Sequence, residues 1–239
     1  MKNYFLTIDT ETTQDDMVAD FAATISDKQG NVLNSCAVLV DGIFTDAENH
    51  PLFFDSSLPS SALWSRSGAD RRYKIYNDMV KNGTRMVASV NGVNAWLAKA
   101  SAVYNPILTA YNLPFDLGKC KTTGIILNDF NRRFDMMNIA QNLLVNNKRF
   151  LKFCLENHCF NAPTSRRNMT FQMKAETVGS FLKGYFSDEP HTALEDIIEF
   201  ELPILRYILK KISVKKLIDA NLSGISWQDR QVKDYFKVK

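Results

Sequence analysis

The chain has 239 residues, 45% of them hydrophobic, which is enough for one sizeable core in a single α/β domain. A formal net charge of +3, from 29 basic and 26 acidic residues, neither requires nor excludes an anionic partner. Four cysteines without regular spacing argue against a disulfide framework, and no apolar run approaches the roughly 18 residues that span a bilayer. We therefore expect a soluble, cytoplasmic protein with no membrane partner.

The first half of the chain contains most of the expected strands. Residues 4–9 are β-branched and aromatic, which predicts a short buried strand. Residues 18–25 and 32–40 flank a polar turn with a glycine, which predicts a hairpin beside that strand. Two further apolar runs, at 107–110 and 133–137, predict a fourth and a fifth strand.

Apolar residues at helical spacing predict the helices between and after these strands. They are expected at residues 73–80, 86–102, 139–145, 150–158, 175–184 and 191–212. Pro203 should bend or divide the last of them, because proline removes a helical hydrogen bond and clashes with the preceding turn. A hairpin followed by alternating helices and strands predicts an α/β fold with a mixed five-stranded sheet flanked by helices. One domain is expected over residues 1–222, with a basic tail at 223–239.

Two acidic residues stand at the end of the first predicted strand. Asp9 and Glu11 are two positions apart, so the side-chain period of a strand points both carboxylates to the same face. Like charges this close oppose each other's ionisation unless a cation neutralises them. By itself such a pair is more typical of a solvated strand edge than of a metal site.

Two later segments add further candidates. Asp116 follows the fourth strand near a helix start, where it could instead cap the helix. In the same segment Asn112 can hydrogen-bond a substrate group, and Phe115 offers a face for base stacking. His191 and Asp196 open the last helix and can point into one cleft, although a lone histidine near a helix start is more often structural.

Taken in order, these motifs resemble the DnaQ-like 3′-to-5′ exonucleases of the DEDD superfamily, histidine subtype, which have a ribonuclease H-like fold. The matching positions are Asp9-x-Glu11, Asn112-x-x-x-Asp116 and His191-x-x-x-x-Asp196. The resemblance extends from residue 4 to about residue 210, and its most specific part is His-Thr-Ala-Leu-Glu-Asp at 191–196. Thr192 stands where members of the tyrosine subtype would have their tyrosine, which supports the histidine subtype.

The resemblance implies a site for two divalent cations, Mg²⁺ or Mn²⁺, about 4 Å apart. Their ligands would be Asp9, Glu11, Asp116 and Asp196, with Asp9 bridging both ions. His191 would act as the general base that deprotonates the attacking water. Nucleoside 5′-monophosphates would leave the 3′ end of single-stranded nucleic acid. Both DNA and RNA stay open, because their discrimination depends on contacts to the 2′ hydroxyl.

Substrate contacts are expected around this site. The backbone of Thr10, Thr12 and Thr13 would receive the terminal hydroxyl, Asn112 would bind a polar substrate group, and Phe115 would stack on a base. Candidate phosphate contacts are Arg66, Arg71, Arg72 and Lys74 in one group and Arg166 and Arg167 in another. Basic clusters of this size are more often ordinary solvated faces. A homodimer is compatible with the stand-alone members of the family.

The sequence also allows two other functions and suggests one other metal site. A catalytically silent nucleic-acid-binding module could share this fold, but the full set of four carboxylates and a histidine favours turnover. An endonuclease of the ribonuclease H type would cut internal sites. Cys154, His158 and Cys159 have zinc-ligand side chains, yet they fall in one predicted helix with no second ligand pair, which argues against a zinc site.

Overall fold

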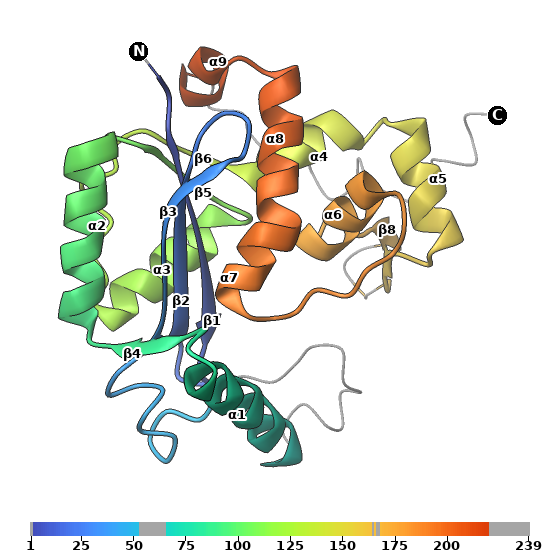
Figure 1. Cartoon of the computed structure of the whole chain (residues 1–239). Coiled ribbons are helices and arrows are strands. Elements are labelled where there is room, and N and C mark those ends of the chain that lie inside the picture. The colour runs from blue at the N-terminus through green and yellow to red at the C-terminus, as the bar shows by residue number, and fades with distance from the viewer. Residues whose placement is uncertain (1, 53–65, 164, 166–167, 220–239) are drawn as a thin grey trace.

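A computed structural model describes residues 2–52, 66–163, 165 and 168–219, with the side chains of 66–71 and 219 excepted. Its centre is a six-stranded sheet in the order β4-β3-β2-β1-β5-β6 (Figure 1). The strands are β1 (Phe5–Thr12), β2 (Val18–Ser26), β3 (Val32–Val40), β4 (Met86–Ala88), β5 (Ile107–Ala110) and β6 (Arg133–Asp135). The predicted domain end at residue 222 and the tail at 223–239 lie outside the described residues.

The strand directions combine a hairpin with parallel strands. β2 pairs antiparallel with both β1 and β3, whereas β5 runs parallel to β1 and β6 runs parallel to β5. The carboxyl ends of β1 and β5 therefore lie side by side at one edge of the sheet. This confirms the predicted α/β class with a mixed sheet, in which a hairpin is joined to parallel strands.

The sixth strand corrects the prediction of a helix from residue 86. Met86, Val87 and Ala88 pair in parallel with the end of β3, and the helix starts only at Val90. Ser89 is its N-cap, and the Ser89 hydroxyl accepts a hydrogen bond from the backbone N–H of Gly92. Three apolar residues in a row are compatible with both the helical and the strand period, so the sequence alone does not distinguish a helix from a strand here. The pairing with β3 makes the segment a strand.

Helices cover both faces of the sheet, with α2 and α3 on one face and α4, α6 and α8 on the other (Figure 1). The helices are α1 (Arg66–Lys81), α2 (Val90–Tyr104), α3 (Leu113–Thr123), α4 (Met136–Leu144), α5 (Lys148–Glu156), α6 (Ala175–Lys183), α7 (Ala193–Asp196), the π-helix η1 (Ile197–Glu201), α8 (Leu202–Lys211) and α9 (Val214–Asp219). A small sheet of β7 (Phe160–Asn161) and β8 (Thr170–Phe171) was not expected. Within the described part of the chain, no helix is long and apolar enough to cross a bilayer.

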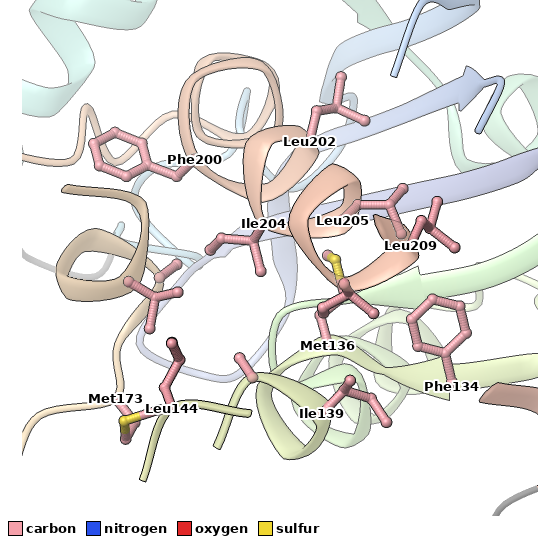
Figure 2. Packing of buried hydrophobic residues seen from close by; sticks show 14 of the residues in the cluster. Phe134, Met136, Ile139, Leu144, Met173, Phe200, Leu202, Ile204, Leu205 and Leu209 are labelled. Atoms are coloured by element: carbon pink, nitrogen blue, oxygen red, sulfur yellow. The ribbon is translucent and has the colours of Figure 1, made fainter. Parts of the chain in front are cut away.

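Two apolar clusters lie on opposite sides of the sheet, and β1 contributes to both. Phe5 belongs to the cluster under α8, while Leu6 and Ile8 belong to the cluster under α2 and α3. Figure 2 shows the first cluster, in which residues of α8 face residues of β6 and α4. Along β1 the face that begins with Phe5 continues to Asp9 and Glu11, because alternate side chains share a face. The acidic pair therefore projects on the α8 side, where the apolar cluster ends.

The predicted division of the last helix at Pro203 is confirmed. The helical run from Ala193 changes to a π-turn in η1 and resumes as α8, with Pro203 in its first turn. Pro203 has no N–H, so a regular helix would leave the carbonyl of Glu199 without its donor. The wider π-turn of η1, just before the proline, accommodates the missing hydrogen bond. It separates α7 from α8.

Candidate active site

The carboxyl ends of β1 and β5 open into a cavity of about 460 Å³. Its acidic and basic lining comprises Asp9, Asp116, Glu176, Glu189, Glu201, His191 and Lys174. The remaining lining comprises Tyr111, Asn112, Phe115, Met137, Gln141, Asn161, Met173 and Ala175. Residues that are almost 200 positions apart in the sequence thus surround one space, and the three predicted motifs all contribute to it.

The second acidic residue of the first motif joins the third motif. Possible ligand atoms of Glu11, His191 and Asp196 all lie within 4.8 Å of one another, which is close enough to share a metal ion. No other such group occurs among the described residues, so Cys154, His158 and Cys159 do not form one. The structure therefore brings side chains of the first and third motifs together.

Two hydrogen bonds hold the backbone of His191 in place. Its N–H donates a hydrogen bond to Asp196 Oδ1 at 3.1 Å, and its carbonyl accepts one from the guanidinium of Arg72 at 2.5 Å. Its φ angle of 56° lies in the left-handed region, which is uncommon outside glycine. Such conformations concentrate at functional sites, where the surroundings hold them in place.

Asp116 lies in the first turn of α3 and is 2% exposed. The N-cap of this helix is Asn112, so Asp116 does not have the capping role that the sequence left open. Its Oδ1 accepts a hydrogen bond of 2.8 Å from the hydroxyl of Thr10 in β1. This bond ties the second motif to the first across the parallel strands.

The cavity concentrates carboxyl groups. Burial raises the pKa of Asp9 well above its ordinary value, and the charges of Glu201, Asp116 and Glu11 raise it further. Burial likewise raises the pKa of Asp116 to about 8 and that of Asp196 to about 10. Buried carboxylates that oppose each other's ionisation are a fitting environment for divalent cations, and an all-carboxylate oxygen set suits Mg²⁺ or Mn²⁺.

Arg72 has a different role from the predicted phosphate contact. It is 8% exposed, and its Nη2 lies 3.0 Å from Glu11 Oε2 while it also donates to the carbonyl of His191. Arg72 therefore links the first motif to the third within the protein. Lys74 is exposed. The other predicted phosphate contacts, Arg66, Arg71, Arg166 and Arg167, lie outside the residues whose side chains are described.

The predicted substrate-binding residues fall into two groups. Asn112 and Phe115 line the cavity, and the Phe115 ring is 44% exposed with Lys119 Nζ 4.7 Å from its centroid. Thr10, Thr12 and Thr13 are buried, and the hydroxyls of Thr10 and Thr13 donate to Asp116 and Asp15. The threonine side chains thus serve the fold, and a role for their backbone in binding the terminal hydroxyl stays a prediction.

Several residues of the site were not foreseen. Arg85 is 1% exposed and pairs with Asp20 of β2 at 3.2 Å and with Glu195 of α7 at 2.5 Å. Asp20 also accepts a hydrogen bond from the N–H of Ala193, which anchors the start of α7. Glu189 and Glu201 add two carboxylates to the cavity. No spacing in the sequence signals these groups, because each joins elements far apart in the chain.

Comparisons with known proteins find similarity in three-dimensional structure and none in sequence. No protein-family model matches the chain, and no curated protein is similar to it in sequence. Solved structures of E. coli exonuclease I are similar in structure. A zinc-bound complex with single-stranded DNA is 15% identical with a TM-score of 0.46, covering 100% of this chain and 43% of that one. A complex with a 5cy-dT13 oligonucleotide is 16% identical with a TM-score of 0.48, covering 92% of this chain and 42% of that one. This chain spans about two fifths of their length.

Proposed function

We propose that this protein is a metal-dependent 3′-to-5′ exonuclease that hydrolyses single-stranded nucleic acid to nucleoside 5′-monophosphates. The observation that carries the proposal is the convergence of three distant motifs. Asp9 and Asp116 line one cavity with His191, and His191 in turn lies within ligand-sharing distance of Glu11 and Asp196. The order of these motifs along the chain, which resembles the DnaQ-like exonucleases, supports the direction of attack.

The residues have distinct roles in this proposal. Asp9, Glu11, Asp116 and Asp196 would hold two divalent cations, Mg²⁺ or Mn²⁺. When bound, such cations neutralise charge that develops on the phosphoryl group and on the leaving 3′ oxygen. His191 accepts the proton of the attacking water, because a neutral imidazole carries a ring nitrogen with a free lone pair. Glu11 and the backbone of His191 are held by Arg72, which keeps the base next to the carboxylates.

The open side of the cavity fits the end of a single strand. Phe115 presents an exposed aromatic face for a base, and Asn112 lies three residues before it with its backbone N–H bound to Asp135 Oδ1 at 3.0 Å. An unpaired base has a free face for stacking, whereas a base inside a duplex does not. This arrangement supports a single-stranded 3′ end as the substrate.

The proposal is tested with linear oligonucleotides of single-stranded DNA and RNA labelled at the 5′ end, and with a circular single strand. With Mg²⁺ we expect a descending ladder of labelled fragments and unlabelled mononucleotides from the linear substrate, and no products with chelator. The circle should stay intact. Cutting of the circle would indicate an endonuclease, and binding without any product would indicate a silent module. Asp9→Asn is the matched inactive variant, since it removes a charge but little volume.

A further inference from the structure

Glu201 is an acidic residue that the proposed mechanism does not use, and it lines the same cavity as Asp9 and Asp116. Its side chain is 3% exposed. Oε1 accepts a hydrogen bond of 3.0 Å from the N–H of Tyr111, at the end of β5. Oε2 is buried and has no hydrogen-bond partner among the described residues. A buried carboxylate oxygen without a partner costs free energy, so its retention calls for an explanation.

The π-turn of η1 explains how the side chain of Glu201 reaches the cavity. In a regular helix, residues five apart such as Asp196 and Glu201 point about 140° away from each other. Here the N–H of Leu202 donates to the carbonyl of Ile197, five residues earlier, which defines the π-turn. The wider turn brings positions five apart closer to one face of the helix. The π-turn thereby aligns Glu201 with the motif that ends at Asp196.

Among the described residues, Glu201 forms no ion pair, although Lys174 lines the same cavity. The two buried arginines near the site pair with other carboxylates, Arg72 with Glu11 and Arg85 with Asp20 and Glu195. The groups around Glu201 are instead acidic, with Asp9 and Asp116 in the same cavity. A buried carboxylate oxygen without a hydrogen-bond partner, in a cavity that other carboxylates also line, is suited to bind a cation from solution.

We propose that Glu201 is an additional ligand of the divalent cations at this site and binds through Oε2, either directly or through one water molecule. The proposal rests on the metal dependence of the proposed function and adds a fifth carboxylate to the four that the motifs supply. Its other oxygen stays on the backbone of Tyr111, so Glu201 also couples the end of β5 to the metal site. The cation is a hard one, Mg²⁺ or Mn²⁺, because all its ligands are oxygens.

The test measures Mn²⁺ binding by titration calorimetry at pH 7.5, without substrate, for the wild type and for Glu201→Gln. Glutamine keeps an acceptor for the Tyr111 N–H and the side-chain volume, but it removes the charge. We expect the dissociation constant for Mn²⁺ to rise about 10- to 100-fold, the range found when groups that support a metal are removed. Glu199→Gln is the control, because Glu199 lies on the same helix, is half exposed and pairs with Lys183. Its Mn²⁺ affinity should not change.

The outcomes separate this inference from the proposed function. Thermal unfolding in chelator shows whether Glu201→Gln folds, and Glu201→Asp, which shortens the side chain but keeps its charge, should also weaken Mn²⁺ binding. If wild type and both Glu201 variants bind Mn²⁺ equally and the wild type degrades oligonucleotides, Glu201 is a structural residue and this inference is wrong while the exonuclease stands. If the wild type neither binds Mn²⁺ nor degrades oligonucleotides, the proposed function fails and this inference fails with it.

Discussion

The backbone of His191 stores strain at the proposed base. A left-handed conformation in a residue other than glycine costs on the order of 1 kcal/mol or more. Both polar backbone groups of His191 are bound to site residues, the N–H to Asp196 and the carbonyl to Arg72. The same contacts that hold the strained turn therefore also set the position of the imidazole relative to the carboxylates.

Replacing His191 with asparagine isolates the chemistry of the imidazole, because asparagine tolerates the left-handed backbone but is not a base at neutral pH. We expect the single-turnover rate of hydrolysis to fall about 100-fold or more, while Mn²⁺ binding is largely retained. His158→Asn is a matched control, since His158 is exposed and also left-handed, with φ of 55°. An unchanged rate in His191→Asn would remove His191 from the mechanism.

Phe115 provides a second single-residue prediction. Because its exposed ring lines the cavity, Phe115→Ala should weaken oligonucleotide binding by about 1–3 kcal/mol, the value of one base stacked on an aromatic ring. The effect should appear in the dissociation constant of a metal-free complex measured by fluorescence anisotropy. Phe186→Ala is the control, because Phe186 has a similar exposed fraction of 41% and does not line the cavity. Equal losses in both variants would argue against stacking on Phe115.

The short helix α7 carries Asp196, and a buried ion pair helps to fasten it to the sheet. Asp20 of β2 accepts from both Arg85 and the N–H of Ala193, and Arg85 also pairs with Glu195 beside Asp196. The side chains of Arg85 and Asp20 are both fully buried. The position of Asp196 relative to β1 thus depends on a network that includes no proposed metal ligand.

Arg85→Met should destabilise the protein by about 3–5 kcal/mol, because removing one partner of a buried ion pair leaves the other charge uncompensated. Urea unfolding measures this loss. The folded fraction should also hydrolyse more slowly, since α7 loses the link to β2 that runs through Arg85 and Glu195 and keeps only the hydrogen bond from Ala193 to Asp20. Arg133→Met, at an exposed position of β6, should change stability by less than 1 kcal/mol. A variant of Arg85 as stable as the wild type would show that α7 is held by apolar packing alone.

At the scale of the whole molecule, the acidic cavity predicts a stability that depends on pH and, if the proposed cations bind, on divalent cations. The pKa values of Glu189, Asp116 and Asp196 are raised, chiefly by burial, to about 7, 8 and 10. A raised pKa means that the folded state holds a proton that the unfolded state, with pKa values near 4, has already released. The stabilisation from these groups is therefore complete below about pH 4 and is lost as pH rises through the folded values.

In chelator, the melting temperature should consequently fall between about pH 5 and pH 9, and scanning calorimetry at several pH values measures the slope. Mg²⁺ should flatten the slope, because a cation compensates the carboxylates once they are ionised. Asp116→Asn should raise the melting temperature in chelator above pH 8, since it removes one buried charge. A melting temperature that rises with pH in chelator would contradict a cavity of mutually repelling carboxylates.

The local features of the fold followed from the sequence. Short stretches of neighbouring residues predict β1 by its alternation, the turn between β2 and β3, and β5 by its apolar run at 107–110. Pro203 alone predicts the division of the last helix. β4 was missed because its three residues have no period of their own, and only pairing with β3 makes them a strand. Elements that depend on a distant partner are thus the ones that local patterns misassign.

The same distinction holds for the site. Asp9, Glu11, Asp116, His191 and Asp196 could be selected as a set because their order resembles that of the DnaQ-like exonucleases, and strand period and helix starts place them at the ends of elements. Their convergence, the use of Arg72 inside the site, the anchoring of α7 by Arg85 and the turn of Glu201 into the cavity were decided by tertiary structure. Strand order and helix packing bring together residues that are far apart in the chain, and no local spacing encodes those distances.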